Sequence, residues 1–124
     1  MSKKVAVGID IGGTNTVYGF INSGGEVIEH VEIPTRGNKP IYDLLSRLDS
    51  RIKLFFKKNP SYELLGVGIG APNGNHFTGE IQSPPNLSWG NVNIVTIFEE
   101  NFNSKTILTN DANAAALGEK KFGA

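Results

Sequence analysis

The sequence predicts a mixed α/β domain, and three observations carry that prediction. Three short runs rich in β-branched residues follow one another at residues 5–11, 15–22 and 26–33, joined by glycine-containing turns. A long helical pattern then leads to a fourth, almost wholly apolar run at residues 64–71. A further succession of helix, strand and helix fills the rest, so we expect one mixed sheet with flanking helices over residues 1–124.

Composition narrows the classes of partner. The 124 residues are 39% hydrophobic and 19% charged, which suits a globular domain with a core. Net charge is zero and lysines occur at most in pairs, which argues against nucleic acid because binding the phosphate backbone needs concentrated positive charge. There is no cysteine, hence no disulfide or thiolate metal site. No stretch approaches the roughly 20 apolar residues of a membrane span, and no signal peptide is evident, so we expect no membrane partner and a cytoplasmic location.

The first two runs predict a hairpin that turns at Gly12-Gly13. Apolar side chains alternate along one face of its first strand: Val5, Val7, Ile9 and Ile11. Asp10 interrupts this apolar strand, where a carboxylate is costly to desolvate unless it is paired or faces a wet cleft. Thr14 and Asn15 follow the glycines with a hydroxyl and an amide.

This combination suits a phosphate and its metal ion. Glycine allows the main chain to approach an anion closely, and the N–H groups of a tight turn form an anion-binding concavity. It is not a P-loop, because Thr14 stands where that motif needs lysine. Taken alone, the turn is equally well explained as an ordinary hairpin with a surface aspartate at position 10.

The third run completes an antiparallel meander. A turn at residues 22–25 precedes it, and its mixture of charged and β-branched residues is typical of an edge strand. Pro40 then begins a helix that ends near Lys58. Its apolar residues form one continuous stripe: Ile41, Leu44, Leu45, Leu48, Ile52, Phe55 and Phe56. Its charged residues are expected to form a solvated face: Asp43, Arg47, Asp49, Arg51 and Lys53.

The run at 64–71 is typical of a buried parallel strand reached through a helical crossover. A small hairpin is expected at residues 75–82.

A second helix is expected at residues 92–102, with Asn91 or Asn93 as its cap. A buried strand follows at 105–109 and an alanine-rich helix at 112–121.

Three loops are expected to meet at one end of the sheet: residues 10–15, 71–75 and 110–111. The polar residues brought together there would be Asp10, Thr14, Asn73, Asn110 and Asp111. Two carboxylates beside glycine-rich loops fit phosphoryl transfer to a hydroxyl, one handling phosphate with a metal ion and the other deprotonating the nucleophile. By itself, Asp111 is more simply explained as the cap of the helix that follows it.

Four motifs occur in a fixed order along the chain: Asp10–Asn15, Gly66–Gly74, Pro85–Trp89 and Asn110–Glu119. Together they resemble the N-terminal part of ROK-family sugar kinases of the bacterial glucokinase type. The resemblance covers nearly the whole chain. It implies the ribonuclease-H-like fold of the actin, hexokinase and Hsp70 ATPases.

The resemblance also implies a reaction, the ATP-dependent phosphorylation of a hexose, with glucose and glucose 6-phosphate as the default pair. It implies that the ATP phosphates are held by Asp10, Gly12, Gly13, Thr14 and Asn15, with Mg²⁺ near Asp10. It implies that the sugar is bound by Asn73, Gly74, Asn86, Asn110 and Asp111. Asp111 would be the catalytic general base.

Two positions depart from the family pattern: Asn73-Gly74 stands where Gly-Arg or Pro-Gly pairs are common, and Ser88 replaces a common glycine. Family members are also considerably longer. Residues 1–124 are therefore expected to be an N-terminal lobe, inactive or weakly active alone, and either an excised domain or a stand-alone half that needs a partner. A C-terminal lobe outside this chain would supply the adenosine pocket, any structural Zn²⁺ site and much of a homodimer interface.

Two other functions remain open. A sugar-sensing repressor of the same family would bind a sugar without turning it over, although such proteins carry a helix-turn-helix ahead of the kinase-like part and the first strand here starts at Val5. An ATPase module of the actin or Hsp70 kind is the other alternative, and the motifs at Pro85-Asn86 and Asn110-Asp111 favour a sugar over it.

Overall fold

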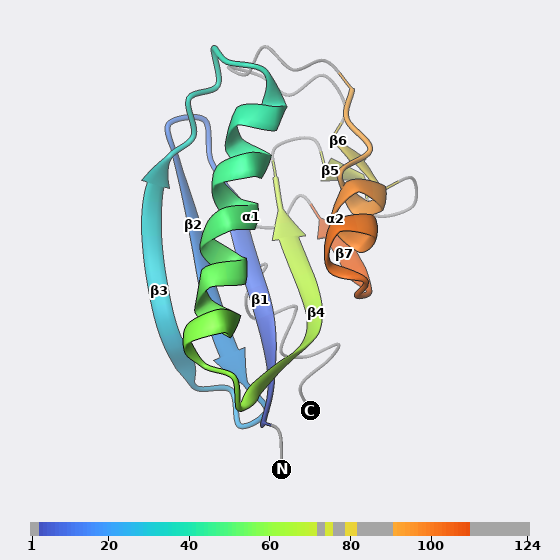
Figure 1. The fold of residues 1–124 in the computed structure, drawn as a ribbon. Coiled ribbons are helices and arrows are strands. Elements are labelled where there is room, and N and C mark those ends of the chain that lie inside the picture. Colours follow the sequence, from blue (N-terminus) through green and yellow to red (C-terminus); the bar gives the residue numbers. More distant parts are fainter. Residues whose placement is uncertain (1–2, 72–73, 76–78, 82–90, 110–124) are drawn as a thin grey trace.

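Five strands form one mixed sheet in the order β3-β2-β1-β4-β7 (Figure 1). The computed structural model describes residues 3–71, 74–75, 79–81 and 91–109. The strands of this sheet are β1 (Lys3–Ile11), β2 (Asn15–Asn22), β3 (Val27–Pro34), β4 (Tyr62–Gly70) and β7 (Thr106–Thr109). The first three pair antiparallel, whereas β4 runs parallel to β1 and β7 runs parallel to β4. The predicted meander, the edge position of its third strand and the buried parallel strand are all confirmed.

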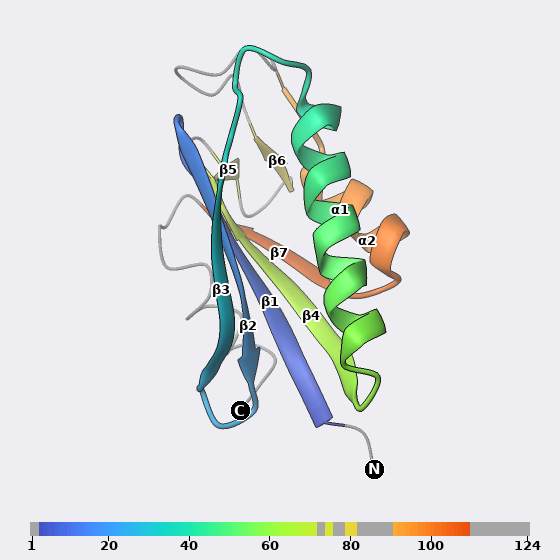
Figure 2. The same cartoon turned by 60° about the vertical axis from the view of Figure 1, so that its left-hand side comes forward.

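Two helices lie on the same face of this sheet (Figure 2). The crossover helix α1 (Ile41–Lys58) begins after Pro40, and Lys57 and Lys58 occupy its last turn, as predicted. Helix α2 (Ile94–Phe102) precedes β7. Within the described residues, no helix is long and apolar enough to cross a membrane.

The main core lies between the sheet and α1. Val5, Val7, Ile9 and Ile11 of β1 pack there, each less than 5% exposed. The predicted stripe of α1 packs against them, with Ile41, Leu44, Leu45, Leu48, Ile52 and Phe55 buried. Near the carboxyl end of α1, Phe20 of β2 stacks on Phe55 with ring centroids 3.7 Å apart and an interplanar angle of 8°.

The second helix begins later than the sequence pattern suggested. Val92 is not helical; its backbone N–H and C=O bond those of Ile81 as an isolated antiparallel bridge. The cap is Asn93, whose side-chain oxygen accepts a hydrogen bond of 3.3 Å from the N–H of Thr96. Of the two predicted caps, Asn93 is therefore the correct one. Apolar periodicity placed Val92 on the helix stripe because it cannot distinguish a bridge residue from a first helical turn.

The small hairpin is present as β5 (Gly74–Asn75) and β6 (Glu80–Ile81), which pair antiparallel in a separate two-stranded sheet. Strand β5 also lies against β7. The bridge from Ile81 to Val92 ties this hairpin to the start of α2. The hairpin is therefore anchored beside the last strand of the main sheet.

Candidate phosphate-binding site

The carboxyl ends of the parallel strands lie level with one another. In the sheet register Asp10 of β1 is beside Gly70 of β4, and Gly70 is beside Thr109 of β7. The segments that follow these three strands therefore start from one edge of the sheet, as predicted. Open α/β sheets bind ligands at this kind of edge.

Asp10 lies on the face of the sheet opposite α1. Its neighbours Ile9 and Ile11 are buried in the core under α1, and successive side chains of a strand point to opposite faces. The side chain of Asp10 is partly exposed, unlike the core residues on either side of it. At this partly exposed position the carboxylate is not fully desolvated.

The loop between β1 and β2, residues 12–14, is closed by a hydrogen bond of 2.9 Å from the Gly12 N–H to the Asn15 carbonyl. A Cβ atom at position 12 would lie only 2.7 Å from that carbonyl oxygen. Among the described residues, the glycines with a left-handed φ are Gly25 and Gly79. Glycine is thus required at position 12 for lack of space, and not for a positive φ.

The same bond determines which backbone N–H groups of the loop remain available to bind an anion. The Gly12 N–H is already used inside the loop. Gly13 and Thr14 are exposed, and their N–H groups donate to no other residue in the described part of the chain. Within this loop, the N–H groups of Gly13 and Thr14 are therefore the backbone donors that no described residue occupies.

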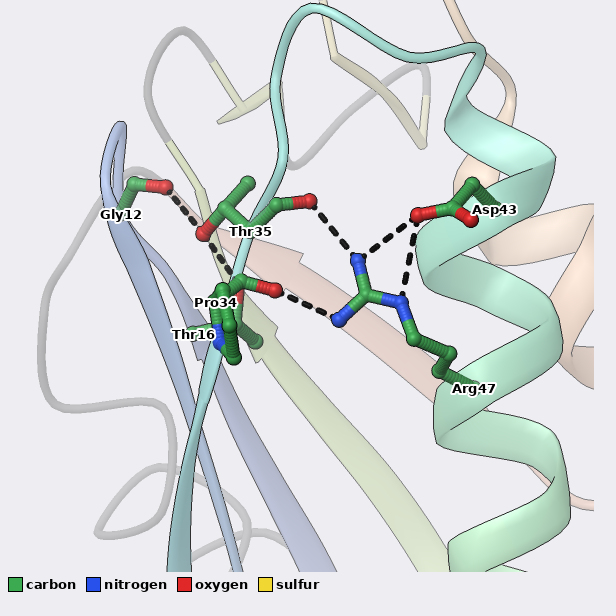
Figure 3. A network of polar contacts seen from close by, with 6 residues as sticks. All are labelled: Gly12, Thr16, Pro34, Thr35, Asp43 and Arg47. Atoms are coloured by element: carbon green, nitrogen blue, oxygen red, sulfur yellow. Dashed lines mark hydrogen bonds and ion pairs between the residues drawn. The ribbon is translucent and has the colours of Figure 1, made fainter.

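A network of hydrogen bonds connects the loop to α1 through Thr35 (Figure 3). The hydroxyl of Thr35 donates to the Gly12 carbonyl (2.8 Å), and the Thr35 N–H donates to the Thr14 carbonyl (2.9 Å). Arg47 of α1 in turn donates to the Thr35 carbonyl (3.0 Å) and to Asp43 (2.9 Å).

This network corrects one sequence-based expectation. Asp43 and Arg47 were expected on a solvated face, but their side chains are only 34% and 20% exposed and form an ion pair inside the network. The sequence pattern also gave no sign of Thr35, which lies 23 residues from its Gly12 partner. No local pattern encodes a contact over that separation.

Among the other predicted site residues, Gly74 is placed by its pairing with Ile81 in the hairpin beside β7. Four others lie outside the described residues: Asn73, Asn86, Asn110 and Asp111. The helix predicted at 112–121 lies outside them as well. Their roles stay predictions.

A magnesium ion fits the donors at the loop, although the described residues contain no cluster of three or more acidic or histidine side chains that could hold a metal by themselves. Mg²⁺ is commonly bound through one or two carboxylates together with substrate phosphates and water. Asp10 supplies one carboxylate and Thr14 an exposed residue with a hydroxyl at the same edge.

The described residues also outline a hollow of about 460 Å³ between α1 and α2. It is lined by Tyr42, Leu45, Ser46, Asp49, Ile97, Glu100 and Asn101. None of the predicted site residues is in this lining, so the hollow adds nothing to the phosphate site.

An antiparallel meander, a crossover helix and parallel strands with a glycine loop at the first strand's carboxyl end define a ribonuclease-H-like domain of the actin and hexokinase type. The chain belongs to the ROK family, whose model matches residues 6–124.

Its relatives include kinases and regulators. The chain is 35% identical to a glucokinase of Halalkalibacterium halodurans over 100% of this chain and 38% of the relative. It is 36% identical to a xylose repressor of Caldicellulosiruptor bescii, over 94% of this chain and 30% of the relative. A solved structure of a putative sugar kinase from Cytophaga hutchinsonii matches with a TM-score of 0.70 and 31% identity, over 95% of this chain and 40% of that one. The chain thus spans well under half the length of these relatives.

Proposed function

We propose that this chain is the N-terminal lobe of an ATP-dependent hexose kinase, with glucose as the default substrate and glucose 6-phosphate as the product. The observation that carries the proposal is that the carboxyl ends of β1, β4 and β7 lie side by side, with an exposed glycine loop after β1. Similarity to a glucokinase over the whole chain supports the same reaction.

In this proposal the ATP phosphates bind along the 12–14 loop. The N–H groups of Gly13 and Thr14, together with the polar side chains of Thr14 and Asn15, contact the phosphate oxygens. Fixed donors aimed at phosphate stabilise the charge of a transferring phosphoryl group without reorganisation during the reaction. Asp10 would hold Mg²⁺ on these oxygens, and the ion would neutralise part of their charge.

The sugar would bind between the strand ends. Asn73, Gly74, Asn86 and Asn110 would contact its hydroxyls, as the family resemblance implies. Asp111 would accept the proton of the hydroxyl that attacks. A bond forms from that oxygen to the γ-phosphorus while the bond to the bridging oxygen breaks, and ADP leaves in line.

The rest of the catalytic apparatus lies outside this chain in our proposal. A C-terminal lobe would complete the nucleotide pocket, carry any structural Zn²⁺ and form a homodimer. The coverage of the relatives, 38% for the glucokinase, supports this division. The 124-residue chain alone is then a weak catalyst, because the adenosine side of the site is missing.

Two substitutions in the full-length protein test the assignment of roles. Asp111→Asn should lower kcat on glucose by about 100-fold or more with the KM for glucose nearly unchanged, because loss of a general base acts on the transition state. Asp10→Asn should instead raise the KM for Mg-ATP and shift its dependence on Mg²⁺. Turnover of Asp111→Asn within a few-fold of the parent would remove that residue from catalysis.

A sugar-sensing regulator is the second candidate, and the 36% identity to a xylose repressor supports it. Such a protein would bind a sugar without consuming ATP. Coupled measurement of ADP release over a panel of hexoses and xylose separates the two candidates. Sugar binding by calorimetry with no ADP release would favour the regulator.

A further inference from the structure

Thr35 is the first residue after β3 and is fully buried. Its hydroxyl donates its only hydrogen to the Gly12 carbonyl at 2.8 Å. The bond of 2.7 Å between the hydroxyls of Thr16 and Thr35 must therefore use the hydrogen of Thr16. With its N–H bonded to the Thr14 carbonyl at 2.9 Å, Thr35 occupies both carbonyls that flank the exposed part of the loop.

These two bonds fix the orientation of two peptide planes. The described chain has no cis peptide, and in a trans peptide the C=O and the following N–H point in opposite directions. Because the Gly12 carbonyl points at Thr35, the Gly13 N–H points away from Thr35. The Thr14 carbonyl fixes the N–H of Asn15 in the same manner.

Thr35 lies between the loop and α1 (Figure 3). For the Gly12–Gly13 peptide, the direction away from the Thr35 hydroxyl is therefore away from α1, toward the face of the sheet that carries Asp10. The bond from the Thr35 N–H to the Thr14 carbonyl continues the β2–β3 pairing and holds that carbonyl in the plane of the sheet. A carbonyl oxygen turned to that face would repel a phosphate, whereas an N–H group attracts it. Thr35 thus determines which charge the Gly12–Gly13 peptide presents to that face.

Arg47 links this arrangement to the helix. Its guanidinium donates to the carbonyls of Pro34 and Thr35, and the Asp43 carboxylate accepts from the same group at 2.9 and 3.2 Å. A planar guanidinium held by a carboxylate one turn earlier on α1 is confined to one orientation. The segment that carries Thr35 is thereby attached to a rigid element.

We propose that Thr35 is a positioning residue for the phosphate loop and that Arg47 anchors it to α1. This inference rests on the proposed function, since it assumes that residues 12–14 bind ATP phosphates. It adds that the loop's affinity for Mg-ATP depends on two residues that do not touch the nucleotide. Both act by keeping the Gly12 and Thr14 carbonyls away from the phosphate face.

The test compares Thr35→Val with Thr35→Ser in the full-length protein. Valine matches threonine in shape but removes the hydroxyl, leaving the Gly12 carbonyl and the buried Thr16 hydroxyl without this partner. Serine keeps the hydroxyl. We expect Thr35→Val to raise the KM for Mg-ATP about tenfold or more, since misplacing a supporting group has effects of this size. The KM for glucose should stay within twofold of the parent value. Thr35→Ser should have a KM for Mg-ATP close to that of the parent.

A second pair of variants tests the same inference if Thr35→Val folds poorly. Arg47→Met removes the anchor from a partly exposed site, and Arg51→Met removes the same charge one turn further along α1. Arg47→Met should raise the KM for Mg-ATP several-fold, and Arg51→Met should leave it unchanged. Calorimetry with a non-hydrolysable ATP analogue should show the same ratios for binding.

The outcomes separate this inference from the function on which it rests. A parent protein that neither binds the ATP analogue nor phosphorylates a hexose overturns both. A parent that is active, with Mg-ATP and glucose KM values unchanged in both Thr35→Val and Arg47→Met, overturns the inference alone. Equal losses for both substrates in Thr35→Val, without rescue by serine, would indicate a purely structural role and likewise overturn it.

Discussion

Replacing Gly12 by alanine gives the sharpest test of the loop structure. The added Cβ would lie 2.7 Å from the carbonyl oxygen of Asn15, and cannot be accommodated by a side-chain movement because the obstructing atom belongs to the backbone. The φ of Gly12 is not in the left-handed region, so alanine would bring no backbone strain of its own at position 12. The perturbation is a steric one between the first residue of the three-residue loop and the first residue of β2.

Its size follows from the geometry. To reach ordinary contact the Asn15 carbonyl must move by about 0.7 Å or more. The same oxygen accepts the 2.9 Å bond from the Gly12 N–H, and a shift of this size away from Gly12 would break that bond. Losing one such bond costs about 1 kcal/mol, and forced overpacking costs about 1 to 3 kcal/mol. We expect a loss of about 2 kcal/mol in the free energy of unfolding.

Urea unfolding of parent and variant measures this loss, and Mg-ATP kinetics measure its effect on the site. Gly24→Ala is the matched control, because its new Cβ would meet nothing closer than the Asn22 side-chain oxygen at 3.5 Å. That control should lie within about 0.5 kcal/mol of the parent. If Gly12→Ala unfolds with the same free energy as Gly24→Ala and keeps the parent's KM for Mg-ATP, position 12 does not lie against the Asn15 carbonyl and the steric argument is refuted.

Two predictions concern the scaffold. Phe20→Ala should lower the free energy of unfolding by about 3 to 5 kcal/mol, because it removes a fully buried ring that is stacked on Phe55. Leu54→Ala, at a 47% exposed position of α1, should change it by about 0.5 kcal/mol or less. Urea unfolding decides, and equal effects would contradict the core assignment. Asn93→Ala should lower the free energy of unfolding by about 1 kcal/mol, because it removes the cap bond from the Thr96 N–H. Asn93→Asp should keep most of this stabilisation, and equal losses in the two variants would count against the cap.

Local periodicity was sufficient to predict most of the scaffold. The alternation at Val5, Val7 and Ile9 placed β1 correctly, and the stripe along α1 identified its buried face. The shared edge of β1, β4 and β7 followed from the rule that parallel strands end together, and the register confirms it. These features depend on residues close in sequence, which is why they are readable from it.

The sequence did not reveal the parts of the site that depend on distant contacts. The glycine at position 12 was explained by turn propensity and anion approach, whereas in the structure it is required by the closeness of the Asn15 carbonyl. Arg47 and Asp43 looked like ordinary surface charges because helix periodicity says only that they face away from the core. The actual partners of Arg47 include carbonyls 12 and 13 residues earlier in the chain.

The strand register explains how a residue so far along the chain comes to support the loop. Pro34, the last residue of β3, pairs with Asn15, the first residue of β2, so Thr35 necessarily arrives opposite Thr14. A slip of one residue between β2 and β3 would turn the Thr35 side chain to the other face and bring a different residue to Gly12. The buried face of β3 resists such a slip, since Ile33 is packed in the core below α1. The packing that stabilises the meander is therefore also what delivers the hydroxyl of Thr35 to the phosphate loop.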